Sequence, residues 1–345
     1  MRSSITRNAC EKKYTATFMR FFLLLLVVGF HASYFHAADL ATEDRGTTES
    51  KAAERSLMQG RIDEAVATLQ RNLASNPTNG QANLLLCRSF YAEEHEDEAI
   101  SACENAVRLL PRSSEAQDWM GRAYGMKANE AGPIAGFTLA RKVKAAFETA
   151  VQLDPMNGPA VNDLSEFYIA APAIIGGGLD KAAALADRAQ ARLPQEAHRI
   201  RALVAEKHKD YGTAEREFKA GVNVGMRPDA RVDLGAFYAR HSQPDRAVEA
   251  LKECLAADRS RDATIVDAAS ILTDMHREPQ RAEQTLLQYL SSEAKSDAAP
   301  VIKVYVMLGK MMDAAGDKRG AKIEFGNALE LAHSYASARQ AQQKL

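Results

Sequence analysis

The segment EDEAISACENAVRLLP, residues 96–111, carries the pattern on which the fold depends. Ala99 is followed by a larger residue at Cys103, a small residue at Ala106 and a proline at Pro111. Positions three and four apart lie on one face of an α-helix. Proline ends a helix, because it has no N–H group and clashes with the preceding turn. The segment is therefore predicted to be a helix that packs closely against a neighbouring helix.

The same pattern recurs along the chain. Pro77 and Pro111 end two consecutive copies, and their numbers give a period of about 34 residues. Further matches lie at Ala65 and Leu69, where Asn72 departs from the pattern; Phe147, Ala150 and Pro155; Ala182, Ala186, Ala189 and Pro194; Ala214, Phe218 and Gly221; Ala247, Leu251 and Cys254; and Ala321, Phe325 and Ala328. A companion pattern for the preceding helix is an apolar residue, a glycine and a large residue three positions on. It occurs at Met120, Gly121 and Tyr124; Leu234, Gly235 and Tyr238; and Leu308, Gly309 and Met312.

These two patterns and their period resemble those of the tetratricopeptide-repeat (TPR) superfamily. The resemblance implies an all-α fold, a right-handed superhelix (α-solenoid) of about eight helix-turn-helix repeats over residues 46–333. We expect the repeats to start near residues 46, 80, 114, 158, 195, 228, 262 and 302. An insertion near residues 127–136 should enlarge the turn between the two helices of the third repeat, and one near residues 171–178 should enlarge the fourth repeat. Residues 334–345 are predicted to form the capping helix that an open stack requires.

The middle of the chain resembles a narrower group. Its segments are WMGRAYGMKA (residues 119–128), LARKVKAAFETAVQLDP (139–155) and DLSEFYIAAPAIIGGGLDKA (163–182). They are similar to a family of exported bacterial TPR proteins that carry GRAYG and FYxxAPxxxGGGxxKA stretches. The resemblance covers about residues 80–200. It implies the fold and export, and it supplies no mechanism.

The N-terminal region has the composition of an export signal. Residues 21–30, FFLLLLVVGF, are apolar apart from one glycine and follow Arg20. This run is too short for a typical spanning helix, which needs about 20 apolar residues. We expect residues 1–38 to be a signal peptide, with Met19 as an alternative start, and residues 39–45 to be a linker. The protein would then be periplasmic, or membrane-anchored and facing the periplasm if the signal is not cleaved.

Bulk composition limits the classes of function. The chain is 46% hydrophobic and 26% charged, as is usual for a packed protein. Its net charge of −1 offers no basic field for nucleic acid. Outside residues 1–37, which carry five Lys/Arg against one Glu, the net charge is −5.

The first helix of each repeat should line the inner face of the superhelix. Repeat positions predict a partner-binding groove made of Arg88, Tyr91, Trp119, Arg122, Met126, Asp163, Glu166, Asp233 and Arg240. Arginine, tryptophan and tyrosine dominate binding hot spots. A basic first half and an acidic second half would suit a peptide bound in one direction. In the alternative interpretation, Trp119 and Tyr91 fill seams between repeats and the charges form a solvated face.

Cys87 and Cys103 are equidistant from His95, which lies in the predicted turn of the second repeat. Residues equidistant from the turn of a helical hairpin face each other, and an exported protein can keep a disulfide. The alternative is two buried thiols that act as small hydrophobes, because helix spacing often exceeds disulfide reach.

The glycine run Gly176, Gly177 and Gly178 precedes a predicted helix with Lys181 in its first turn. Free N–H groups at a helix N-terminus can bind an anion. A phosphate-binding loop, however, requires a hydroxyl after the lysine, where this chain has Ala182. A structural loop is the alternative interpretation.

We find no His-Glu-x-x-His, Gly-x-Ser-x-Gly or Cys-x-x-Cys motif in the sequence. The prediction is therefore a non-enzymatic scaffold of the bacterial cell envelope, without cofactor or metal, which holds a protein or peptide on its concave face. The alternative is a small-molecule-binding accessory protein, for example to a transporter. It would use a pocket between the two insertions, lined by Ile174, Ile175, Trp119 and Met126.

Overall fold

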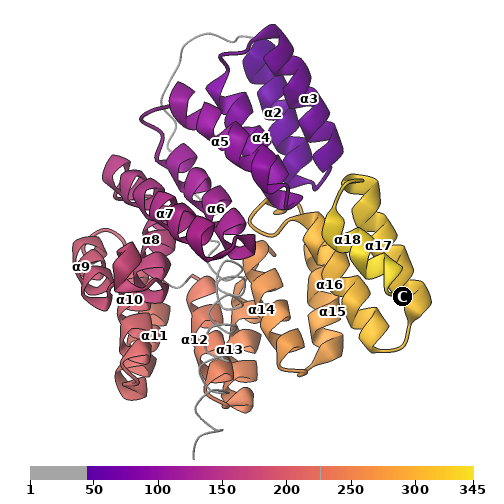
Figure 1. Cartoon of the computed structure of the whole chain (residues 1–345). Coiled ribbons are helices and arrows are strands. Elements are labelled where there is room, and N and C mark those ends of the chain that lie inside the picture. The colour runs from indigo at the N-terminus through magenta and orange to yellow at the C-terminus, as the bar shows by residue number, and fades with distance from the viewer. Residues whose placement is uncertain (1–44, 226) are drawn as a thin grey trace, which may run out of the picture.

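The computed structural model describes residues 45–225 and 227–345. Within them the chain forms seventeen α-helices and one short 3-10 helix, and no strand (Figure 1). The predicted signal peptide and all but the last residue of the predicted linker lie outside the described residues. The all-α prediction is confirmed for the part of the chain that the structure describes.

Sixteen of the helices form eight antiparallel pairs. The first helices of the pairs are α2 (Arg45–Met58), α4 (Gly80–Ala92), α6 (Ser114–Glu130), α8 (Gly158–Ala170), α10 (Pro194–Lys207), α12 (Asp229–Arg240), α14 (Ala263–Asp274) and α16 (Val301–Ala314). Their partners are α3 (Ile62–Ser75), α5 (Glu96–Leu109), α7 (Pro133–Leu153), α9 (Leu179–Ala189), α11 (Tyr211–Gly225), α13 (Pro244–Ala257), α15 (Pro279–Ser291) and α17 (Lys318–Leu331). Helix α18 (Ala336–Gln343) follows, within the segment predicted to cap the stack. Each first helix begins within one residue of the predicted repeat start, so the eight repeats are confirmed.

The repeat residues have the packing roles that their sizes suggest. A Cβ atom added at Gly121 would lie 2.3 Å from the ring of Phe147, on the partner helix. The same relation holds in the last repeat, where a Cβ at Gly309 would lie 2.4 Å from Phe325. The glycine therefore lets the aromatic side chain of the second helix lie against the backbone of the first.

The two insertions differ from each other. We expected residues 127–136 to enlarge a turn, but they lengthen both helices of the third pair and leave only Ala131 and Gly132 between them. Residues 171–178 do form an irregular segment, which contains the 3-10 helix η1 (Ala173–Ile175). It packs against α7 and so rests on the lengthened third pair.

The first and last repeats meet, which the repeat pattern did not predict. In Figure 1 the C-terminal helices α16 to α18 lie beside the N-terminal pairs. The contact is apolar at its centre: one hydrophobic core includes Leu57 of α2, Ile302 of α16 and Tyr335 beside α18. Polar contacts surround it, including the hydrogen bond from Ser334 Oγ to Glu93 (2.8 Å). The superhelix is thus closed by contacts between residues that are far apart in the sequence.

Candidate functional site

The inner face of the superhelix is built from the first helices of the pairs. From α2 to α16, each first helix contacts the first helix of the next pair, whereas no comparable contact joins successive second helices among those described. The closer spacing places the first helices on the inside of the curve. Arg199, Asp233 and Asp267 lie one repeat period apart on α10, α12 and α14, so they occupy equivalent positions on three neighbouring helices.

Arg88 of α4 is the first charged centre of this face. Its Nε donates to Asp297 (2.6 Å), and its Nη1 lies 3.1 Å from Glu115 and 3.7 Å from Glu54. Burial lowers the pKa of Arg88, but the three carboxylates outweigh burial and raise it. Asp297 belongs to the linker between α15 and α16, so this ion pair joins the second repeat to the last.

Arg122 of α6 is the second centre. Its Nε donates to Asp163 of α8 (2.6 Å), and its Nη2 lies 3.0 Å from Asp118. Burial raises the pKa of Asp118 well above its usual range; Arg122 opposes the rise, and Asp163 and Glu115 add to it. Two carboxyl groups therefore share one guanidinium.

Arg199 of α10 is the third centre, and the sequence analysis did not identify it. Its Nη2 donates to Glu166 (2.5 Å) and its Nε donates to Asp233 (3.1 Å). Burial raises the pKa of Glu166 to about 7, although Arg199 opposes the rise. The arginine thus bridges α8 and α12, the first helices of the preceding and following pairs.

The inner face also contains polar atoms without partners. Asp118 Oδ1, Arg199 Nη1 and both side-chain atoms of Asn162 are buried and make no hydrogen bond. Asn162 lies on α8 next to Asp163 and has no exposed surface. An unpaired buried polar group costs about 1–3 kcal/mol. The described face is therefore incompletely satisfied by its own side chains.

The aromatic residues of the predicted groove lie together. Trp119 and Tyr91 make an edge-to-face contact with ring centroids 5.3 Å apart. The guanidinium carbons of Arg122 and Arg88 lie 4.7 and 5.6 Å from the Trp119 ring centroid. Trp119 is therefore buried at the seam between α4 and α6, within the charged face.

Two other predicted groove residues are placed differently. Met126 is half-buried and packs against the hydrophobic core. Arg240 donates from Nε and Nη2 to the two carboxylate oxygens of Glu206, each at 2.9 Å. This ion pair joins α12 to α10, and its carboxylate, Glu206, is not one of the two that accept from Arg199.

The glycine loop satisfies its own backbone. Gly176, Gly177 and Gly178 donate their N–H groups to Ala173, Pro172 and Tyr168, and Lys181 Nζ donates to the carbonyl of Gly176 (2.8 Å). A Cβ at Gly177 would lie 1.8 Å from the carbonyl oxygen of Ala171. These three N–H groups already have acceptors, and a side chain at Gly177 would clash with the backbone. The structure therefore favours a structural loop over an anion site.

Cys87 and Cys103 are joined in the structure, with Cα atoms 5.0 Å apart. The bond links α4 to α5, the pair that carries Arg88. Cys254 is a buried free thiol.

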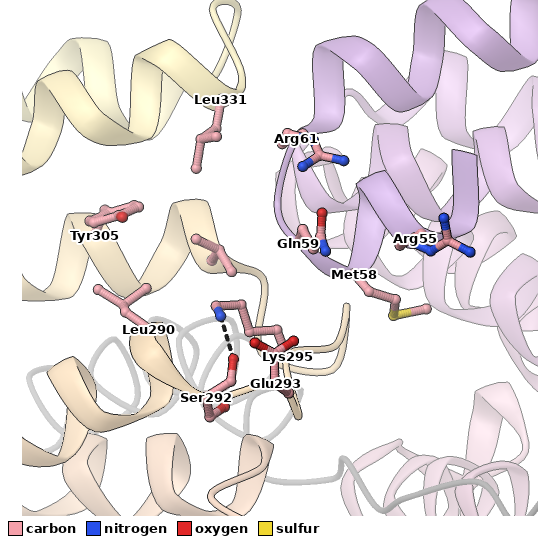
Figure 2. A pocket seen from close by; sticks show the side chains of 11 residues that line it. Arg55, Met58, Gln59, Arg61, Leu290, Ser292, Glu293, Lys295, Tyr305 and Leu331 are labelled. Atoms are coloured by element: carbon pink, nitrogen blue, oxygen red, sulfur yellow. Dashed lines mark hydrogen bonds between the residues drawn. The ribbon is translucent and has the colours of Figure 1, made fainter. Parts of the chain in front are cut away.

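The residues predicted to line a small-molecule pocket between the insertions differ in exposure. Ile174 is 80% exposed, whereas Trp119 is 5% exposed, so the two do not line one enclosed space. A cavity of about 650 Å³ lies instead where the first and last repeats meet. Figure 2 shows Arg55, Met58, Gln59 and Arg61 on one side of it and Leu290, Ser292, Glu293, Lys295, Tyr305 and Leu331 on the other.

Metal-binding clusters and membrane spans are both absent from the described residues. These residues contain no group of three or more His, Cys, Asp or Glu side chains arranged to hold a metal ion. Among them, no helix is both long and apolar enough to cross a membrane.

Comparison with known proteins supports the repeat assignment. The family model of the tetratricopeptide repeat matches residues 56–124. The fold is a TPR superhelix. Yeast Tom70 is similar in structure, with a TM-score of 0.53 and 14% identity, over 100% of this chain and 75% of that chain. TTC0263, a thermophilic TPR protein from Thermus thermophilus, has a TM-score of 0.43 and 17% identity, over 66% of this chain and 99% of that one.

Among the curated proteins, no sequence matches this chain. TPR superhelices generally act as protein-binding scaffolds, typically without catalysis of their own, through the surfaces that their stacked helices present.

Proposed function

We propose that this protein is a non-enzymatic scaffold that binds a peptide or an extended protein segment along the inner face of its TPR superhelix. The observation that carries the proposal is the composition of that face. Three arginines, their carboxylate partners and the Trp119–Tyr91 pair follow successive first helices, and several buried polar atoms among them have no partner. A peptide supplies both donors and acceptors for such atoms along its backbone.

We place ligand entry where the first and last repeats meet. Arg88 is 7% exposed and its partner Asp297 is 9% exposed, so a ligand reaches Arg88 and the neighbouring Trp119 when this contact opens. Besides the Arg88–Asp297 pair, this contact contains the Lys303–Glu94 and His333–Asp63 pairs, hydrogen bonds from Ser334 and Ser337 to Glu93 and Glu94, and apolar residues of one hydrophobic core. We propose that separation of the two ends is the route by which a ligand reaches the inner face.

We further propose that the protein works in the bacterial cell envelope. The support is the sequence of residues 1–38, which has the order of an export signal. The Cys87–Cys103 pair fits this location, because disulfides persist in oxidising compartments. Cell fractionation and N-terminal sequencing of the mature protein test it: recovery of an intact N-terminus in the cytosol would contradict export.

Intrinsic fluorescence tests inner-face binding directly, because Trp119 is the only tryptophan of the chain. Peptides selected from a random library on the purified full chain should change Trp119 emission at the concentrations at which they bind. Trp119→Phe should keep the fold and lose the signal, and calorimetry on this variant measures the affinity independently. If the selected peptides bind without changing Trp119 emission, the ligand surface lies elsewhere and the proposal fails.

A further inference from the structure

We propose that the ligand of the inner face is cationic: a peptide segment that carries lysine or arginine, recognised by carboxylates of α6, α8, α12 and α14. This inference rests on the function proposed above and names the chemistry of its ligand. It differs from the sequence prediction of a groove that is basic in its first half.

Acidic side chains outnumber basic ones in the contacts of the inner face. Arg88, Arg122 and Arg199 are the cations of the connected inner contacts. Their carboxylate partners are Glu54, Glu115, Asp297, Asp118, Asp163, Glu166 and Asp233. Seven acids thus surround three arginines. Arg240 and Arg227 also act on Asp233, but in the first half of the face five acids surround Arg88 and Arg122 alone. Carboxylates that share a cation leave part of their negative potential unbalanced, and an added positive charge lowers the energy of the whole set.

Asp267 continues the row of inner-face acids from α12 to α14. It lies on α14, one repeat after Asp233, and is 9% exposed. Burial raises the pKa of Asp267 well above its usual range, and Asp233 and Asp262 add to the rise. All the groups that influence it strongly are therefore acidic, and a ligand cation beside Asp267 would offset that repulsion.

Buried acceptors on the inner face indicate a ligand with N–H donors, independently of the count of charges. Asp118 Oδ1 and Asn162 Oδ1 are buried acceptors without a donor, on the neighbouring helices α6 and α8. A lysine ammonium has three donors and an arginine guanidinium has five, and neither has an acceptor. Asn162 Nδ2, also without a partner, can donate to a peptide carbonyl. A cationic peptide therefore supplies what each of these atoms lacks.

The test compares three dodecapeptides of equal length: alternating Lys and Ala, alternating Glu and Ala, and alternating Ser and Gly. Each is titrated into the purified full chain, with Trp119 emission and calorimetry as readouts. We expect the Lys peptide to bind at least tenfold more tightly than the others. We also expect its affinity to fall as NaCl is raised from about 0.05 M to about 0.5 M, because salt screens the attraction.

The deciding variant is Asp267→Asn. It removes a buried carboxyl group whose pKa is raised by burial and by two other acids, so the fold should be kept and the melting temperature should not fall. Its affinity for the Lys peptide should fall by about three- to tenfold, because an amide, unlike the carboxyl group, cannot ionise beside the bound cation. The matched control is Asp187→Asn on the outer helix α9, whose side chain is 74% exposed; it should bind the Lys peptide as the wild type does.

The outcomes separate the two proposals. If the Glu or the Ser peptide changes Trp119 emission and the Lys peptide does not, the cationic specificity is wrong and inner-face binding stands. If the Lys peptide binds wild type and Asp267→Asn equally, Asp267 is not part of the site, and the proposed recognition of a cation by the carboxylates of α12 and α14 is wrong. If neither these peptides nor library-selected ones change Trp119 emission, the proposed function itself fails.

Discussion

Single side chains of the inner face tie stability to pH. Burial raises the pKa values of Asp118, Asp233 and Asp267, and it raises that of Glu166 to about 7. A carboxyl group whose pKa is higher in the folded state favours folding while it is protonated. For Glu166 that contribution is fully present below its ordinary pKa of 4.5 and is lost as pH rises through the folded value. Glu166 therefore makes the folded protein less stable at pH 8 than at pH 5, and Asp118 and Asp267, whose pKa values lie well above the usual range, act in the same direction.

Glu166→Gln tests this coupling. The amide keeps an oxygen that can accept from Arg199 and removes the charge. Urea unfolding should show the variant gaining stability relative to the wild type as pH rises from 5 to 8, by about 2 kcal/mol in all. Asp187→Asn, whose carboxylate is exposed, should show no such trend. A constant difference between Glu166→Gln and wild type at all pH values would mean that Glu166 does not titrate in this range.

The predicted groove residues show what repeat position can reveal. Arg88, Trp119, Arg122, Asp163, Glu166 and Asp233 all lie in the inner contacts, because the repeat period fixes which side of a helix a residue occupies. Arg199 was missed because the fifth repeat matches the pattern weakly, although it lies one repeat before Asp233. Asp297 could not have been found this way: it belongs to a linker, and its partner Arg88 lies in the second repeat, at the other end of the chain.

Helix pairs depend on the close approach that the repeat glycines allow. Gly121 of α6 lies against Phe147 of α7, and a Cβ there would lie 2.3 Å from the ring. Gly121→Ala should therefore lower the free energy of unfolding by about 1–3 kcal/mol, since overpacking forces the ring to move. Thermal and urea denaturation measure it.

Gly326→Ala is the matched control for that substitution. Gly326 also lies within a helix, α17, but a Cβ there meets nothing within 4 Å. It should stabilise the protein by up to about 1 kcal/mol through helix propensity alone. If both variants were stabilised, the α6–α7 contact would be looser than the structure indicates.

The helix starts were easier to predict from the sequence than the structure of the insertions. Helix starts agree to within one residue because proline, glycine and small residues recur at fixed offsets. The insertion at residues 127–136 was misjudged as a turn, although it is helical apart from Ala131 and Gly132. Local pattern does not distinguish an enlarged turn from two lengthened helices that pack against each other.

At the scale of the molecule, closure of the superhelix cannot be deduced from the sequence of any single repeat. It depends on the curvature summed over eight pairs, which brings the α15–α16 linker onto α4. The linker is held in place by Tyr289, whose hydroxyl oxygen lies 3.2 Å from the carbonyl oxygen of Ser296 and 2.7 Å from that of Ala299. Asp297, between these two anchor points, is thereby presented to Arg88.

Asp297→Asn should loosen this closure. It removes one charge from a pair in which both residues are less than a tenth exposed, while Glu115 and Glu54 remain near Arg88. We expect the free energy of unfolding to fall by about 2 kcal/mol, below the roughly 3–5 kcal/mol typical of a buried pair with no other partner. Because Arg88 lies over Trp119, acrylamide should quench Trp119 more strongly in this variant, and the radius of gyration from X-ray scattering should rise.

The control and the contrary result decide what closes the superhelix. Asp187→Asn should change neither the quenching nor the radius. Unchanged quenching and radius in Asp297→Asn would mean that the remaining contacts between the first and last repeats, including the hydrophobic core to which Leu57, Ile302 and Tyr335 belong, close the superhelix without the ion pair. The route of ligand entry proposed above would then need opening of that core, and substitutions at Ile302, not at Asp297, should control how fast a peptide reaches Trp119.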